Sequence, residues 1–228
     1  RQALPDDYKD KLVQVKQKEY ELVYGGKMRR ENILANEDVV FPVPLQNEKT
    51  FNGKREQWKD GWKNIIAFGD NLQFMKTIYE NKDPLIKNKV KGKVKLIYID
   101  PPFATKSDFG GKDGEYSYTD KVDRAHFLET LRERLLYLRE LLADDGSIYV
   151  HLDQKMSHYV KIIMDEIFGK DIFINEVIWS YTSGGAGIKS FAKKHDSILV
   201  FSRTKDYGFN QQKIKRYVDK SKGYDPRI

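Results

Sequence analysis

The chain has 228 residues, of which 33% are charged and 39% are hydrophobic, and it contains no cysteine. This length suits one domain with a real core. No apolar run approaches the roughly 18 residues of a membrane span, and the lack of cysteine excludes a disulfide framework or a thiolate metal site. We see no signal peptide in residues 1–7, so we expect a cytoplasmic protein that needs no membrane.

The formal net charge of +7 is concentrated at one end of the chain. From Lys189 onward there are 11 Lys and Arg residues against 4 Asp residues, which equals the whole excess. A basic end on a balanced chain suits contacts with the phosphates of a polyanion, and the candidate nucleic-acid-binding residues are Lys189, Lys193 and Lys194. A solvated charged surface explains the same composition.

Residues 1–59 are predicted to form an N-terminal extension. Residues 7–24 carry apolar side chains at helical spacing, and Gly25 and Gly26 would end that helix. Residues 39–44 are expected to be extended, because each of two prolines biases its predecessor away from helix. The extension is predicted to be a lid, an oligomer arm or a support for the core.

The first strand–helix unit is predicted over residues 64–81. A strand at 64–68 leads through Gly69 and Asp70 into a helix that begins at Asn71. Asp70 is therefore a good helix N-cap, and at a strand end it is also placed to face a ligand. Both roles can hold together.

A second unit contains the strand 94–99, which must stop at Pro101 and Pro102 because proline cannot donate to a β-ladder. A long loop over 104–123 follows, then a leucine-rich helix over 124–142. Gly146 leads into a strand at 147–152, and Asp153 is expected to cap a helix that ends at Gly169. Strands are predicted at 176–179 and 197–202. This alternation predicts an α/β fold with a parallel or mixed sheet and helices on both faces.

The chemistry is predicted at the end of the strand 94–99, in the motif Asp100-Pro101-Pro102-Phe103. Open α/β sheets bind ligands at the carboxyl ends of their strands. The exocyclic amine of a nucleobase is a poor nucleophile, and two acceptors on its N–H bonds would orient it for alkylation. Asp100 offers one acceptor and the carbonyl of Pro101 the other. Phe103 offers a face for stacking a flipped-out base, worth roughly 1–3 kcal/mol. A plain turn with an Asx cap explains the same residues equally well.

The motif and its context resemble DNA amino-methyltransferases of the β-group, in which the catalytic motif precedes the cofactor loop. The resemblance is strongest to modification subunits of type III restriction-modification systems and covers residues 58–205. Its ordered segments are residues 62–72, 100–103, 118–120, 142–153, 175–181 and 194–201.

The resemblance implies a Rossmann-like sheet of the S-adenosylmethionine-dependent methyltransferases, with a circularly permuted motif order. It implies methylation of adenine N6 in DNA, with Asp100, Pro101, Pro102 and Phe103 as catalytic residues. Asp70, Asn71 and Asp100 would bind the cofactor S-adenosylmethionine, and no metal is implied. Residues 60–205 would be the catalytic half and 206–228 the start of a basic target-recognition region. DNA, a restriction subunit and a second copy of the chain are the expected partners.

One departure from the family pattern is that the sequence holds no Phe-x-Gly-x-Gly cofactor loop. We therefore expect a methyltransferase domain that is incomplete in this chain and inactive alone. The alternatives are a non-catalytic DNA-binding or scaffold subunit and a cytosine-N4 methyltransferase. Relatives that act on cytosine more often carry Ser in place of Asp100, which favours adenine.

Other motifs carry less chemistry. Residues 183–190 are glycine-rich but lack the adjacent Gly-Lys of a phosphate loop, so we expect a loop near the DNA or cofactor cleft. The four histidines show no metal-ligand spacing, and His126 and His158 are predicted on helix surfaces. His195 and Asp196 are expected either in a strand-entry turn or, by the resemblance, near the cleft.

Overall fold

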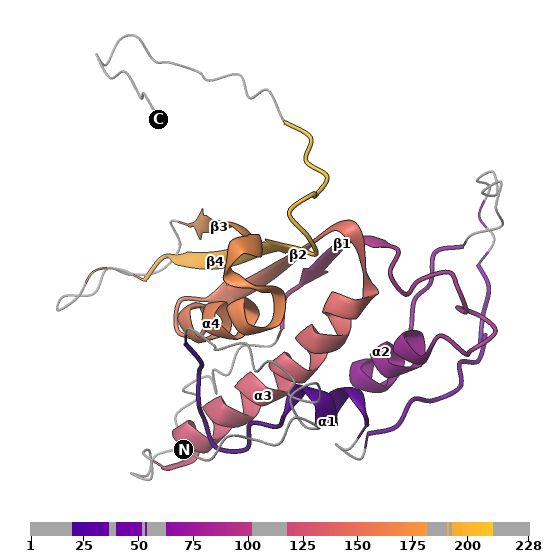
Figure 1. Cartoon of the computed structure of the whole chain (residues 1–228), viewed down its shortest axis with the longest axis horizontal. Helices are drawn as coiled ribbons and strands as arrows, with labels where there is room; N and C mark the ends of the chain where they lie inside the picture. The colour runs from indigo at the N-terminus through magenta and orange to yellow at the C-terminus, as the bar shows by residue number, and fades with distance from the viewer. Residues whose placement is uncertain are drawn as a thin grey trace, which may run out of the picture.

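The structure is a computed structural model that describes residues 20–36, 40–51, 53, 63–101, 118–181, 191 and 193–211. Figure 1 shows a sheet of four strands with helices packed beneath it. The elements are, in chain order, α1 (Arg30–Leu34), α2 (Asn71–Glu80), β1 (Val94–Ile99), α3 (Tyr118–Leu141), β2 (Leu142–Asp153), α4 (Ser157–Phe168), the 3₁₀-helix η2 (Lys170–Ile172), β3 (Phe173–Ser180) and β4 (His195–Ser202).

The sheet is mixed, as predicted, and its strand order is β1-β2-β4-β3. β1 runs parallel to β2, whereas β4 runs antiparallel to both β2 and β3. The carboxyl ends of β1, β2 and β3 and the first residues of β4 therefore meet at one edge of the sheet. We call this the carboxyl edge.

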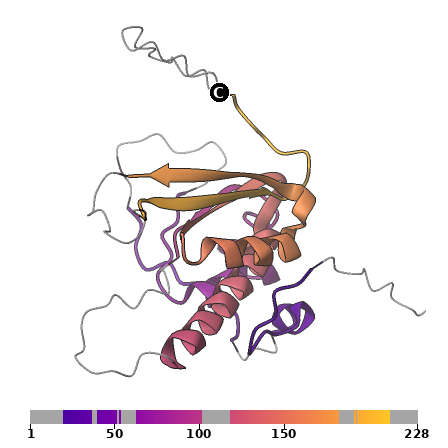
Figure 2. The same ribbon diagram turned by 90° about the vertical axis from the view of Figure 1, so that its left-hand side faces the viewer.

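One face of the sheet carries the hydrophobic core. α3 connects β1 to β2, and α4 follows β2, so both helices pack on the same face and against each other. Figure 2 shows both helices on one side of the strands. Most members of the apolar stripes predicted for the two helices are confirmed as core: Leu128, Leu131, Leu135, Leu138, Leu141, Val160, Ile163, Met164, Ile167 and Phe168. Phe127 is only half-buried, and Leu142, which is buried, belongs to β2 and not to the helix.

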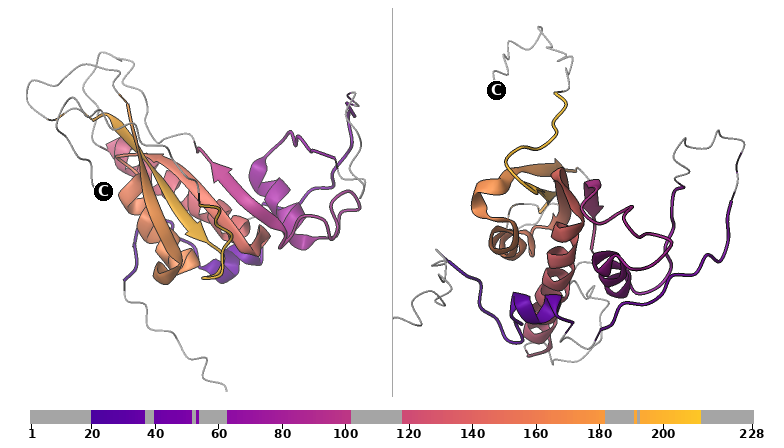
Figure 3. Two further views of the ribbon diagram at one scale, coloured as in Figure 1. Left: turned by 90° about the horizontal axis from the view of Figure 1, so that it is seen from above. Right: turned by 45° about the vertical axis from the view of Figure 1, so that its right-hand side comes forward.

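The opposite face of the sheet is open in the part of the chain that is described. Strand alternation and register place Leu96, Tyr98, Val177 and Trp179 on this face, and each is 43–62% exposed. We call it the open face. The α/β class is confirmed, and helices covering this second face stay a prediction. α2 packs against α3 beside the β1 edge (Figure 3, left).

The predicted strand at 64–68 is wrong, because these residues form no β-ladder. Ile66 and Phe68 are almost fully exposed, so the apolar run has no neighbouring strand in this structure. An isolated extended segment cannot satisfy its backbone groups as a strand does. The helix that follows is confirmed: α2 begins after the N-cap Asp70, whose side chain accepts from the backbone N–H of Gln73 at 2.9 Å.

Other boundaries also differ from the predictions. α3 begins at Tyr118, so the loop predicted to continue to residue 123 ends earlier. Asp153 does not cap α4; its carboxylate accepts from the N–H groups of Lys155 and Met156 in the turn before the helix. Gly169 ends α4 as predicted. Residues 20–24 are not helical, and the rest of the helix predicted over 7–24 lies outside the described residues.

The described parts of the N-terminal extension pack on the helices. Of the three predicted roles, this packing favours that of a support for the core. Residues 40–45 lie along α2, where the hydroxyl of Thr77 accepts from the N–H of Val43 and donates to its carbonyl. The buried ammonium of Lys76 donates to the carbonyl of Val40 at 2.6 Å.

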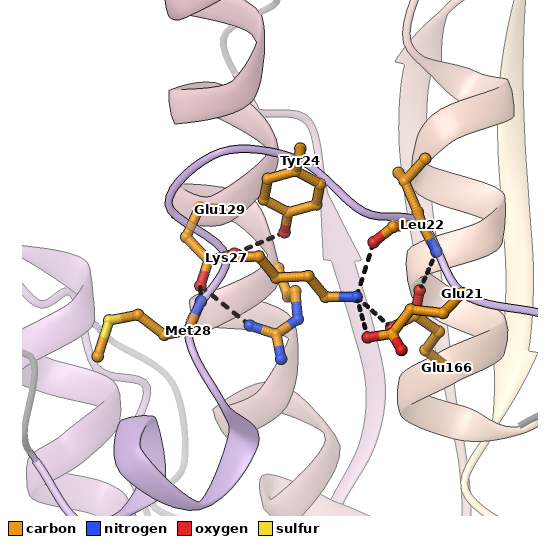
Figure 4. Close-up of polar contacts among 8 residues, drawn as sticks. Glu21, Leu22, Tyr24, Lys27, Met28, Glu129 and Glu166 are labelled. Atoms are coloured by element: carbon orange, nitrogen blue, oxygen red, sulfur yellow. Dashed lines mark hydrogen bonds and ion pairs between the residues drawn. The ribbon is translucent and has the colours of Figure 1, made fainter. Parts of the chain in front are cut away.

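A second stretch, residues 20–28, crosses α3 and α4, and we call it the strap (Figure 4). The buried carboxylate of Glu129 on α3 accepts from the Tyr24 hydroxyl and the N–H of Met28. Lys27 donates to Glu166 on α4 at 2.8 Å. Burial, together with the hydrogen bond to Glu129, raises the pKa of the Tyr24 hydroxyl, so this group stays a proton donor.

Candidate functional site at the carboxyl edge

Asp100 lies directly after β1 at the carboxyl edge, as its position before two prolines predicts. Its side chain is 55% exposed, so a ligand can reach both carboxylate oxygens. Pro101 follows and is half-buried. Pro102 and Phe103, the other two predicted catalytic residues, lie outside the described residues. The structure therefore places a carboxylate, followed by a rigid turn, where an α/β sheet presents its chemistry.

Three further polar side chains lie near Asp100 on the open face, and His151 connects them to it. The ring of His151, on β2, lies between two carboxylates: its Nδ1 is 3.7 Å from Oδ2 of Asp100, and its Nε2 is 3.6 Å from Oδ2 of Asp196. The hydroxyl of Tyr98 on β1 is 3.1 Å from the same Nδ1. His195 and Asp196 are the first residues of β4, so they lie within the strand and not in a turn before it. A location near a substrate cleft stays a prediction.

Two predicted cofactor residues, Asp70 and Asn71, are used within the fold. Asp70 caps α2, and its second oxygen is 4.0 Å from the guanidinium of Arg134 on α3. The side-chain oxygen of Asn71 accepts from Nε of Arg134 at 2.7 Å. The carboxylate of Asp70 remains half exposed, which leaves it accessible to a ligand as well.

The predicted nucleic-acid contacts lie partly at the same edge. Lys193 is exposed and Lys194 half-buried, and both immediately precede β4. The carbonyl of Lys194 accepts from the N–H of Tyr181, which ties the segment to the end of β3. Lys189 lies outside the described residues. The two described lysines are therefore positioned on the side of the sheet where Asp100 is presented.

A charged pair marks the opposite edge of the same two strands. The ammonium of Lys95 donates to the carboxylate of Asp145, and this hydrogen bond holds the pKa of Asp145 below its usual range. Asp145 is 48% exposed, close to the value for Asp100. It is therefore a matched control for Asp100, since both are exposed carboxylates near the ends of neighbouring strands.

Among the described residues, no cluster of His, Asp and Glu has an arrangement that would hold a metal ion. No described helix is long and apolar enough to cross a bilayer. His126 and His158 lie exposed on helices, as predicted. His151 was not singled out from the sequence, because the spacing of the four histidines carries no sign that one of them reaches Asp100.

Comparison with known proteins places the chain in a class. Residues 94–228 match the DNA methylase family, an N6/N4 methylase domain, and this match covers more than half of the chain. The chain therefore belongs to the DNA methylase family. The matched region begins with β1, so it contains Asp100 and the whole sheet.

Two curated relatives show which proteins the chain is similar to. The type II methyltransferase M.EcaI of Enterobacter cloacae is 41% identical over 134 residues, which are 58% of this chain and 30% of that protein. The EcoP15I Mod subunit of a type III restriction-modification enzyme from Escherichia coli is 26% identical over 218 residues, 85% of this chain and 32% of the relative. The chain thus spans about a third of the length of these relatives.

Among solved structures, the PvuII DNA methyltransferase, which is cytosine-N4-specific, is 14% identical with a TM-score of 0.39. The superposition covers 61% of this chain and 48% of the other. A likeness this distant supports no conclusion. The fold class stated above comes from the strand order and register of this chain itself.

Proposed function

We propose that the chain is the catalytic part of a DNA methyltransferase that modifies N6 of adenine, within the modification component of a restriction-modification system. The observation that carries the proposal is the exposed carboxylate of Asp100 at the carboxyl edge, within the region that matches the DNA methylase family. Of the two curated relatives named above, one is a methyltransferase and the other a Mod subunit, which supports methyl transfer as the activity.

In the proposed reaction, the chain orients a flipped-out base. Asp100 and the Pro101 carbonyl accept the two amine hydrogens, which directs the nitrogen lone pair toward the methyl group. The N–C bond would form as the methyl–sulfur bond breaks, which leaves a neutral thioether, and the methylated nitrogen would then lose one proton. Phe103 stacks on the base, and Lys189, Lys193 and Lys194 contact phosphates. Rate enhancement would come from positioning and from acceptors that are already in place.

The implied cofactor is S-adenosylmethionine, which supplies an electrophilic methyl group on a sulfonium. Of the three residues predicted to hold it, Asp100 and Asp70 each keep about half of their side-chain surface exposed. Asn71 has its oxygen engaged by Arg134. These residues fit one side of a cofactor site, and we propose weak binding by this chain alone, because the sequence lacks the family's glycine loop.

Specificity and partners are also proposals. Asp100 favours adenine N6 over cytosine N4, and a restriction subunit is the proposed protein partner, since the EcoP15I relative is a Mod subunit. A homodimer stays a prediction that sedimentation would test. A non-catalytic scaffold is the competing function.

The deciding experiment is transfer of a labelled methyl group from S-adenosylmethionine to mixed-sequence DNA. The 228-residue chain and the whole protein that contains it are tested side by side. We expect activity in the whole protein, little or none in the chain alone, and loss of at least about 10³-fold in Asp100→Ala. The labelled base, identified after digestion, separates N6-methyladenine from N4-methylcytosine.

Asp145→Ala is the matched control, because it removes an equally exposed carboxylate from the opposite edge of the sheet. It should leave the methyl transfer rate within about 2-fold, as expected of a surface substitution. Retained DNA binding with no methyl transfer by the whole protein would instead favour the scaffold. Equal loss in both variants would mean that Asp100 acts through stability and not through the base.

Phe103 is tested separately. Phe103→Ala should raise the KM for DNA, by about 10-fold or more if stacking is worth roughly 1–3 kcal/mol. Phe103→Trp should keep most of the activity, because it also offers an aromatic face. A harmless Phe103→Ala would exclude stacking as the role of this residue.

A further inference from the structure

Asp100 is held at the exposed end of a polar cluster that spans three strands. Tyr98 comes from β1, His151 from β2 and Asp196 from β4. The exposed fraction of the side chains falls from 55% at Asp100 to 19% at His151 and 21% at Asp196. Asp100 and Tyr98 are therefore open to solvent, whereas His151 and Asp196 are largely covered.

The His151 ring has a polar neighbour at each of its nitrogens, within hydrogen-bond distance at Nδ1 and just beyond it at Nε2. The Tyr98 hydroxyl lies 3.1 Å from Nδ1, and the two rings are 6.4 Å apart between centroids. Asp196 lies 3.6 Å from Nε2. Antiparallel pairing sets Asp196 opposite Asp153, two residues beyond His151 and on the same face, so the sheet register itself brings the carboxylate to the ring.

An exposed carboxylate at a strand end rotates about its χ angles unless something holds it. A positioned acceptor must keep one oxygen on the amine, and an error of about 1 Å in such a group can cost about 10²-fold in rate. Nδ1 of His151 is 3.7 Å from Oδ2 of Asp100, a distance that a small rotation of the exposed carboxylate closes to a hydrogen bond.

We propose that His151 is a positioning residue for Asp100. Nδ1 binds one carboxylate oxygen of Asp100 in place of the Tyr98 hydroxyl, Asp196 faces Nε2 on the other side of the ring, and the second oxygen of Asp100 faces the amine. This inference rests on the proposed function, because it assigns His151 a role in that reaction. It predicts an effect on kcat and little effect on substrate binding, since the ring does not contact the base.

The test uses pairs of similar substitutions in the whole protein. Asn places an amide nitrogen close to the position of Nδ1, whereas Gln reaches the position of Nε2. His151→Leu should lower kcat about 10²-fold, with the KM for DNA and for cofactor within about 3-fold. His151→Asn should recover about 10-fold of that loss, and His151→Gln should recover less. A purely structural histidine would not distinguish Asn from Gln.

Wild type, Asp100→Ala and His158→Leu are run beside these variants. His158 is exposed on α4, so its variant should match wild type. An active wild type with an inactive Asp100→Ala and a normal His151→Leu would overturn the role of His151 and leave the proposed function standing. An inactive wild type would overturn both. Thermal unfolding checks each variant, and if His151→Leu fails to fold, the comparison of Asn with Gln decides.

A second measurement does not depend on methyl transfer. The 228-residue chain holds four histidines, so ¹⁵N-histidine labelling gives few ring signals. The signals that disappear in a His151→Asn sample are those of His151. Asp100→Asn should shift the ring ¹⁵N resonances of His151 and leave those of His126 and His158 in place. Asp145→Asn should shift none of them. Unchanged His151 signals in Asp100→Asn would contradict the contact on which the proposal stands.

Discussion

The strap depends on one buried carboxylate, and removing it should loosen residues 20–28 from the helices. Glu129 accepts from the Tyr24 hydroxyl at 2.5 Å, from the N–H of Met28 at 3.0 Å and from Nη1 of Arg132 at 3.0 Å. Arg132 is also buried, at 6% exposed. Glu129→Ala therefore leaves a buried cation and two half-buried donors without their acceptor.

The expected cost follows from these three partners. Breaking a buried ion pair by removing one member costs about 3–5 kcal/mol, so Glu129→Ala should lower the free energy of unfolding by about 3 kcal/mol or more. Glu129→Gln keeps one oxygen for Met28 and Arg132, and the Tyr24 hydroxyl can turn to accept from the new amide. It should cost only about 1 kcal/mol.

Urea denaturation followed by circular dichroism measures both values, and hydrogen exchange reports on the strap directly. The N–H groups of Leu22 and Met28, which donate to Glu166 and Glu129, should exchange faster in Glu129→Ala. Glu48→Ala, on an exposed stretch, is the control and should change stability by less than about 0.5 kcal/mol. An Ala variant as stable as wild type would refute the view that this carboxylate anchors the strap.

Two further predictions concern β2 and its neighbours. A Cβ at Gly146 would lie 2.6 Å from the carbonyl oxygen of Val94, so Gly146→Ala should destabilise the protein by about 1–3 kcal/mol in urea, whereas Gly208→Ala, with only ordinary contacts, should not. The pKa of Glu140 lies below its usual 4.5, because the hydrogen bond from Arg203 and nearby guanidinium charges outweigh the desolvation that would raise it. A lowered folded-state pKa adds stability above pH 4.5 that disappears as pH falls through the folded-state value. Glu140→Gln should therefore cost stability at pH 7, and denaturation curves at falling pH should show the gap to wild type closing below pH 4.5.

The sequence predicted the elements that carry their own signals. β1 is an apolar run stopped by two prolines, and the leucine stripe of α3 needs one face of a helix to be buried. The start of β4 at His195 and the length of β2 were less accurate, because strand ends depend on the partner strand. The register of β1 against β2 shifts between Val94 and Leu96, and regular pairing begins with Leu96 opposite Ser147. Ser147 directly follows Gly146, which explains why the sequence placed the beginning of β2 at this glycine.

The failed strand at 64–68 shows what local pattern leaves out. Residues 65–68 form an apolar run much like that of β1, yet a strand exists only when another backbone pairs with it. In the described structure β1 has β2 on one side, and residues 64–68 do not fill the other. Pairing is a property of the assembled sheet, so no scan of these residues alone would have found the error.

The same limit applies to the candidate site, where Asp100 was found from sequence and His151 was not. Asp100 stands next to the prolines that end its strand, so its position at the carboxyl edge follows from local chemistry. His151 and Asp196 are 51 and 96 residues further on, and only the parallel pairing of β1 with β2 and the antiparallel register of β4 bring them to Asp100. A one-residue slip of β2 would turn His151 to the core face and break the cluster. The neighbours of Asp100 are thus set by sheet register, whereas Asp100 itself is marked by its motif.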